Sequence, residues 1–204
     1  MRTLVIESST DACSAALFDG TDLIDGQYEL LGRSHAERLV PMISELPDKG
    51  KAHRIAASLG PGSFTGTRIG IAVAQALAFA WGARCVGYPT LALVAAMARS
   101  SVGDQPVAVA MTGGHGEWFV EGFAPGGASA WPLASLGPQQ AANRATETIV
   151  AGTQATQLVL LRESGKALDL LPDARSFSLL PEAALTSELS PIYGRAPDAR
   201  RPAS

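Results

Sequence analysis

Residues 53–81 constrain the fold more than any other part of this sequence. A strand pattern at residues 53–59 runs directly into Gly-Pro-Gly-Ser-Phe-Thr-Gly at residues 60–66, and a helical pattern follows over residues 67–81. Gln75 is the only polar side chain between positions 69 and 81. A helix that is apolar all round is normally covered on every side. We therefore expect this helix to pack on a sheet, with its outer face covered by a second layer of the same chain or by another protein.

Strand and helix patterns alternate throughout the first half of the chain. The order β-β-β-α-β-α-β-α predicts an α/β fold in which a mixed sheet carries helices on its faces. The first helix is expected to begin with a capping box, in which the Ser34 hydroxyl and the Glu37 carboxylate bond to backbone N–H groups. The predicted strands are residues 3–8, 13–18, 22–30, 53–59 and 85–88, and the predicted helices are residues 34–46, 67–81 and 91–99.

A second unit is predicted after the polar sequence Ser-Ser-Val-Gly-Asp at residues 100–104. Residues 106–112 and 117–123 read as two strands of a hairpin. Residues 124–138 are rich in Gly, Pro and Ala and are expected to be irregular, and only weak, short signals follow. We therefore divide the chain into an N-terminal domain at residues 1–103, a C-terminal α/β domain at residues 104–195 and a mobile tail at residues 196–204.

Composition excludes several classes of protein. Apolar residues make up 47% of the chain and charged residues 17%, which argues against a disordered chain or a coiled coil. The net charge of −3 argues against a surface that binds nucleic acid by neutralising phosphates. The longest apolar stretch, between Arg68 and Arg84, is shorter than the roughly 20 residues of a membrane span. We expect a cytoplasmic protein with no membrane segment.

Two sets of residues could bind a phosphate or a metal. A loop between a strand and a helix N-terminus can hold an anion on backbone N–H groups, but it can equally be a tight turn that brings strand and helix together. Thr67-Arg68 follows the last glycine where a Walker loop has Lys followed by Ser or Thr. Glu7 and Asp11 could hold Mg²⁺, or could serve in burial and turn formation. The candidate nucleotide-proximal residues of the loop are Gly60, Gly62, Ser63, Thr65 and Gly66.

A transition-metal site is not expected. The three histidines, His35, His53 and His115, fall on separate predicted elements, and no pair shares a helical turn. A His-x-x-x-His site is therefore excluded. No Ser/His/Asp triad can be assigned from the sequence.

Four segments resemble motifs of the TsaB (YeaZ) family. The resemblance covers most of residues 1–100 and is patchy afterwards. Its most specific part is the glycine-rich loop followed by Arg68-Ile69-Gly70. The other matching segments are His35 with Arg38-Leu39 and Pro41-Met42, then Gly116-Glu117-Trp118, and finally Pro191-Ile192-Tyr193 with Arg195.

The resemblance implies both a fold and a function. The fold is the actin-like, sugar-kinase-like ATPase fold, with two related α/β domains of which the second is degenerate. The function is that of a non-catalytic scaffold subunit in the complex that transfers a threonylcarbamoyl group to N6 of adenosine 37 in tRNA. The implied protein partners are TsaD, TsaE and, when the chain is alone, a second copy; tRNA is met only through the complex. ATP or ADP is implied at an interface of the complex and no cofactor in this chain alone.

The resemblance also suggests where the partner binds. Small residues recur every four positions at Gly66, Gly70, Ala74 and Ala78, so one side of the helix is nearly flat. We expect this flat side and the apolar side of the helix at residues 34–46 to form the interface. The predicted interface residues are His35, Leu39, Met42, Ile43, Gly70, Ala74, Leu77 and Ala78.

Two enzymatic alternatives remain. The chain could be an ATP-binding enzyme that uses Glu7, Asp11 and the loop at residues 60–66. A glycoprotease-like metallopeptidase would require metal ligands. TsaD carries a His-x-x-x-His site shortly after the strand that corresponds to residues 85–88, whereas this chain has Tyr-Pro-Thr-Leu-Ala at residues 88–92.

Overall fold

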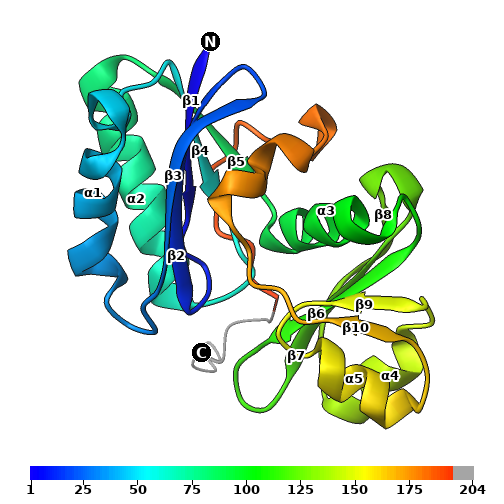
Figure 1. The fold of residues 1–204 in the computed structure, drawn as a ribbon. Helices are drawn as coiled ribbons and strands as arrows, with labels where there is room; N and C mark the ends of the chain where they lie inside the picture. The colour runs from blue at the N-terminus through cyan, green and yellow to red at the C-terminus, as the bar shows by residue number, and fades with distance from the viewer. Residues whose placement is uncertain (195–204) are drawn as a thin grey trace, which may run out of the picture.

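The computed structural model describes residues 1–194, which form two five-stranded sheets (Figure 1). The first sheet has the strand order β3-β2-β1-β4-β5, and the second has the order β10-β9-β6-β7-β8. Helix α3 (Thr90–Val102) lies between them. The strands of the first sheet are β1 (Arg2–Glu7), β2 (Ala12–Asp19), β3 (Asp22–Leu30), β4 (Arg54–Ser58) and β5 (Arg84–Tyr88).

In the first sheet, β1 pairs with β2 in the antiparallel sense and with β4 in the parallel sense. One face is covered by α1 (His35–Glu45) and α2 (Phe64–Trp81), which lie side by side and pack on a core that includes Leu4, Ile6 and Ile55. The opposite face packs against Leu93 of α3 and against the 3₁₀ segment η3 (Ala174–Leu179). Both faces of the sheet are therefore buried, which explains the continuous apolar runs of β1 and β2.

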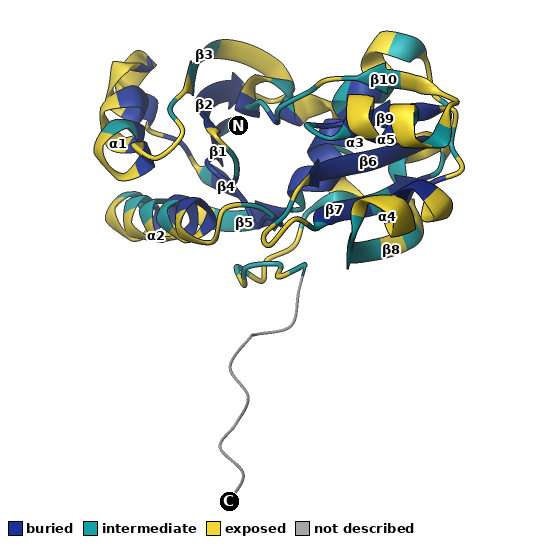
Figure 2. Ribbon diagram, turned by 90° about the horizontal axis from the view of Figure 1, so that it is seen from below, coloured by how far each residue is buried: buried dark blue, intermediate teal, exposed yellow. Residues whose placement is uncertain are grey.

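The second sheet is also covered on both faces. Helix α3 packs on one face, while α4 (Pro138–Arg144) and α5 (Ala155–Arg162) cover the other. The buried strands of both sheets and the exposed outer faces of their helices are visible in Figure 2. The strands of the second sheet are β6 (Val107–Thr112), β7 (Trp118–Phe123), β8 (Ser129–Leu136), β9 (Ile149–Ala151) and β10 (Lys166–Leu168).

After β10 the chain returns to the first sheet. The hydroxyl of Ser14 on β2 accepts a hydrogen bond from the backbone N–H of Ala174 at 2.9 Å. A single bridge then joins Gly87 of β5 to Thr186, just beyond the 3₁₀ segment η4 (Glu182–Ala184). The expected domain boundary at residue 103 stays a prediction, and the expected tail at residues 196–204 lies outside the described residues.

The element order predicted for the first half is confirmed, with differences at the helix starts. The Ser34 hydroxyl makes no capping bond, so the capping box prediction is wrong. At the start of α1, Nε2 of the His35 ring lies 3.4 Å from the carbonyl oxygen of Ala12 on β2. Helix α2 begins at Phe64, three residues earlier than predicted, because the Ser63 hydroxyl caps it by accepting from the N–H of Gly66.

In the second half the hairpin of β6 and β7 is confirmed. The expectation that residues 124–138 are irregular is wrong. A 3₁₀ turn, η2 (Pro125–Gly127), leads into β8, which pairs with β7. The indole of Trp131 packs so closely on Gly122 that a Cβ there would lie 2.0 Å from its nitrogen. Helix α4 and strand β10 were not expected from the sequence.

Candidate functional site

The predicted partner interface lies mostly inside this chain. Leu77 is half-buried, and the other seven residues are buried: His35, Leu39, Met42, Ile43, Gly70, Ala74 and Ala78. The flat side of α2 faces the first sheet: a Cβ on Gly70 would lie 3.4 Å from Cγ2 of Ile6 on β1 and 2.3 Å from the hydroxyl oxygen of Ser8, the residue after β1. The small residues thus bring α2 close to its own sheet. The prediction that this stripe is an open surface for another protein is wrong.

The uncovered face of α2 is the opposite one. The Phe79 side chain is 93% exposed, which is unusual for a large apolar residue. Val40, on the neighbouring helix α1, is 51% exposed. We call the exposed residues Ala72, Gln75, Ala76, Phe79 and Ala80 the α2 outer face. The larger residues Ile69, Val73 and Leu77 are half-buried and pack against the core of the first sheet. Within residues 1–194, nothing covers the exposed residues of the outer face.

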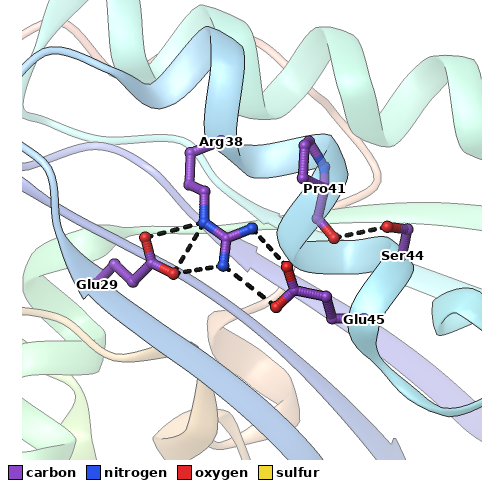
Figure 3. A network of polar contacts seen from close by, with 5 residues as sticks. All are labelled: Glu29, Arg38, Pro41, Ser44 and Glu45. Carbon is purple, nitrogen blue, oxygen red and sulfur yellow. Dashed lines mark hydrogen bonds and ion pairs between the residues drawn. The ribbon is translucent and has the colours of Figure 1, made fainter.

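Arg38 fixes α1 beside this face. Its guanidinium donates two hydrogen bonds from Nε to Glu29 of β3, at 2.8 and 2.9 Å, and one from Nη1 to Glu45 at 2.7 Å (Figure 3). These bonds lower the pKa of both carboxyls and raise the pKa of Arg38. Pro41 lies within α1 without ending it, and its carbonyl accepts a hydrogen bond from Ser44. The first turn and the end of α1 are therefore held to each other and to the sheet edge.

The glycine-rich loop packs against the turn that follows β1. The backbone N–H of Ser63 donates to the carbonyl of Ser9 at 2.6 Å, and a Cβ on Gly62 would lie only 1.9 Å from that same oxygen. One turn later, the Ser8 hydroxyl donates to the carbonyl of Gly66 at 2.9 Å. Thr65 is exposed in the first turn of α2. The glycines are required for close packing between the turn and the helix start, which was one of the two interpretations of the loop.

The same loop forms one wall of a cleft of about 860 Å³ between the two sheets. The other walls are the hairpin at residues 111–115, with Phe119, and the segment at residues 191–194. Asp11 lines the cleft, but Glu7 does not. Within residues 1–194, no three His, Cys, Asp or Glu side chains lie together as metal ligands. The cleft has the volume of a small-molecule site.

Glu7 is fully buried beneath the cleft. Its carboxylate accepts hydrogen bonds from the backbone N–H of Ser9 at 2.8 Å and from the Ser9 hydroxyl at 2.6 Å. Burial raises the pKa of Glu7, although these hydrogen bonds and one from Tyr88 oppose the shift. The Ser9 hydroxyl also lies 2.8 Å from the Thr90 hydroxyl, which connects the buried carboxyl to the start of α3.

The raised pKa of Glu7 predicts a stability that falls with rising pH. Above its ordinary pKa of 4.5, the unfolded chain releases a proton that the folded chain keeps until its own, higher pKa. Stability therefore decreases as pH rises from 4.5 through the folded-state pKa. Glu7→Gln is expected to flatten this pH dependence. At pH values above the folded-state pKa of Glu7, the variant should be more stable than the wild type.

Urea denaturation at pH 5 and pH 8 measures the effect. The matched control is Glu37→Gln, at an exposed position on α1, which should leave the pH dependence of the wild type unchanged. If Glu7→Gln loses as much stability between pH 5 and pH 8 as the wild type, Glu7 is not the source of the pH dependence.

Comparison with known proteins places the chain in a family. The family described as "TsaD: tRNA N6-adenosine threonylcarbamoyltransferase" matches residues 29–128. The Escherichia coli K12 protein named tRNA threonylcarbamoyladenosine biosynthesis protein TsaB is 39% identical over 125 residues, which cover 58% of this chain and 53% of that protein. The solved structure of YeaZ from Pseudomonas aeruginosa is 31% identical, has a TM-score of 0.77 and is aligned over 95% of this chain and 100% of its own. The chain belongs to the TsaB/YeaZ family.

The fold expected for a TsaB/YeaZ protein is confirmed. A second structure from Pseudomonas aeruginosa, described as similar to peptidase YeaZ, has a TM-score of 0.80 over 95% of this chain and 99% of its own, at 31% identity. The ethanolamine utilization protein EutJ from Carboxydothermus hydrogenoformans, 10% identical with a TM-score of 0.50, shares the architecture of two α/β units over 89% of this chain and 90% of its own. The chain thus has the actin-like, sugar-kinase-like ATPase fold. The match to the Escherichia coli TsaB spans about half of that relative's length.

Sequence reasoning missed Phe79, the most exposed large apolar side chain on α1 and α2, and the exposed Val40 of α1. A signal for Phe79 was present, because on a helix it projects to a different side from the small residues at positions 70, 74 and 78.

No helix within residues 1–194 is both long and apolar enough to cross a membrane.

Proposed function

We propose that this chain is a subunit for tRNA threonylcarbamoyladenosine biosynthesis that acts by binding other proteins and supplies no catalytic side chain. The curated relatives carry this pathway in their names, which supports the first part. The observation that carries the second part is the α2 outer face, where a 93% exposed phenylalanine stands among alanines on an ordered helix. The proposed setting is the cytoplasm.

The proposed interface is the α2 outer face together with the exposed side of α1. Burying a phenylalanine side chain contributes about 1.5–3 kcal/mol, so Phe79 would act as an anchor. Alanines on both sides of it allow a partner helix to approach closely. Gln75 is the one polar side chain of the α2 outer face and carries no charge, so an apolar helical surface is the partner chemistry that fits α2. The exposed side of α1 adds the carboxylates of Glu37 and Glu45 at the edge of the interface.

The proposed protein partners are TsaD, TsaE and, in their absence, a second copy of this chain. Transfer RNA would be met through the assembled complex. We place ATP or ADP at an interface of that complex. The loop at residues 60–66 supports this placement, because Gly62, Ser63 and Gly66 are already engaged in holding the loop against residues 8 and 9.

A substitution on the outer face tests the proposal. Phe79→Asp is expected to weaken binding to TsaD by about 100-fold, because it removes the anchor and places a charge in an apolar contact. The matched control is Leu160→Asp, at a 63% exposed leucine on α5 in the other unit. Light scattering after size exclusion and a titration with TsaD measure assembly, and thermal melting confirms that both variants fold.

If a folded Phe79→Asp chain binds TsaD with the affinity of the wild type, the α2 outer face is not the interface. Equal weakening by Phe79→Asp and Leu160→Asp would also contradict it, because the effect would then not be specific to α2.

The cleft favours a second candidate, an ATP-binding enzyme. Its volume of about 860 Å³ and the presence of Asp11 and Arg68 in its walls are compatible with a nucleotide. This candidate requires the isolated chain to bind ATP with micromolar affinity in the presence of Mg²⁺ and to turn it over. Calorimetry on the isolated chain, followed by a phosphate-release assay, separates it from the scaffold proposal.

A further inference from the structure

Residues 191–194, which we call the strap, cross the cleft between the two sheets. The backbone N–H of Ile192 donates to the carbonyl of Leu59, at the end of β4, with a distance of 2.7 Å. The Ile192 carbonyl oxygen lies so close to Gly60 that a Cβ there would be 3.3 Å from it. The strap is therefore attached to the first unit at the start of the glycine-rich loop.

The strap also contacts the second unit. Gly194 packs on the ring of Phe119, a residue of β7, and a Cβ on Gly194 would lie 2.4 Å from Cδ1 of that ring. Only a residue without a side chain fits at this distance. Both walls of the cleft are thus contacted within three residues of the same segment.

Tyr193 is held by the first turn of α2. The guanidinium of Arg68 donates from Nη2 to the Tyr193 hydroxyl at 2.7 Å, and its Cζ lies 3.5 Å above the ring of Phe64. The rings of Phe64 and Tyr193 are 6.1 Å apart at an angle of 33°. A cation stacked on one ring and hydrogen-bonded to the other is a directional contact, so it fixes the position of the strap as well as its attachment.

We propose that the strap and Arg68 form a lock that holds the two sheets in one relative orientation. Helix α3 packs on both sheets and forms an apolar contact between the two units. Motion of one unit about this helix would open the cleft, and contacts that cross the cleft oppose that motion. Here the polypeptide passes between the units at α3, returns after β10, and is then fastened across the open side of the cleft by Ile192, Tyr193 and Gly194.

Hydrogen exchange of the isolated full-length chain tests the lock. Tyr193→Ala and Arg68→Ala are expected to accelerate exchange of the Ile192 amide by about tenfold or more, because its bond to Leu59 then opens locally. The Val5 amide, in the central strand β1, should exchange as in the wild type. Tyr193→Phe keeps the ring and loses the hydroxyl, so an intermediate acceleration is expected.

Tyr28→Ala is the matched control, because Tyr28 also lies beneath an arginine, with the Arg175 Cζ 5.3 Å from its ring centroid, but on β3 away from the cleft. A distance measurement between spin labels at Thr21→Cys and Leu160→Cys, one in each unit and with Cys85→Ala in the background, reports the orientation. The distance distribution should broaden in Tyr193→Ala and not in Tyr28→Ala.

Unchanged Ile192 exchange and an unchanged distance distribution in Tyr193→Ala would overturn the lock. Equal acceleration of the Ile192 and Val5 amides would also overturn it, because the change would then be a loss of global stability. These outcomes depend only on the fold and are independent of whether the chain binds TsaD.

Discussion

Gly62→Ala is expected to destabilise the protein by about 3 kcal/mol or more, or to prevent folding altogether. A methyl group at this position would lie 1.9 Å from the backbone oxygen of Ser9, a separation that no rotamer change can relieve. The same oxygen accepts the hydrogen bond from the N–H of Ser63, so moving it also breaks the tie between the loop and the β1–β2 turn. Thermal melting should show a decrease of about 6 °C or more.

Gly114→Ala is the control for this experiment. Gly114 also lines the cleft, but a Cβ there would meet no atom within 4 Å. Its melting temperature should therefore stay close to that of the wild type. If Gly62→Ala melts like Gly114→Ala, the close approach between the loop and Ser9 does not exist in solution.

Close packing of α2 on the sheet determines whether a substitution in this helix measures binding or folding. The interface expected from the sequence, with Gly70 and Ala74 facing a partner, implies that Gly70→Leu or Ala74→Arg abolishes pairing and leaves the fold intact. The structure contradicts this expectation, because Gly70 touches the Ser8 hydroxyl and Ala74 is fully buried. Loss of binding in such variants would reflect a damaged core. Phe79 is the position at which binding and folding can be separated.

The first half of the fold was predictable because its signals are strong and local. Buried strands such as β1 and β4 are uninterrupted apolar runs, and the glycine-rich loop marks where β4 ends and α2 begins. The direction in which α2 faces was not predictable in the same way. Its small-residue side and its large-residue side are both apolar, so periodicity alone does not say which side meets the sheet.

The second half was harder to predict for two physical reasons. Strand β8 lies at a sheet edge and contains Pro132, and proline in a strand pattern normally argues against a strand unless the strand is at an edge. Strands β9 and β10 have only three residues each, too short for any periodicity to show. Strand β9 pairs with β6, and β10 pairs with β9, which no local pattern reveals.

The candidate site shows the same limit. The sequence singled out residues 60–66 and the segment at residues 191–193, and the structure brings these segments together around the cleft. Their contact joins residues more than a hundred positions apart, as in the bond from Arg68 to Tyr193. Chemistry at single residues identified the parts, but only the topology shows that they meet.

Phe177→Ala is expected to cost about 3–5 kcal/mol of unfolding free energy, the range observed for truncating a buried phenylalanine. Phe177 lies in η3 and is 6% exposed. Its ring centroid is 5.5 Å from that of Tyr88 and 6.1 Å from that of Phe18, and the Arg54 guanidinium lies 5.8 Å from it. Urea denaturation measures the loss.

Leu179→Ala is the control in the same 3₁₀ segment, because Leu179 is 42% exposed and should lose little stability on truncation. The comparison tests whether the C-terminal part of the chain is an integral layer of the first sheet. If it is, Phe177→Ala lowers the stability of the strands at residues 2–19 as much as that of η3, and fluorescence and circular dichroism report one shared transition. An early transition confined to η3, with the sheet unaffected, would show that β1 and β2 need only α1 and α2 to stay folded.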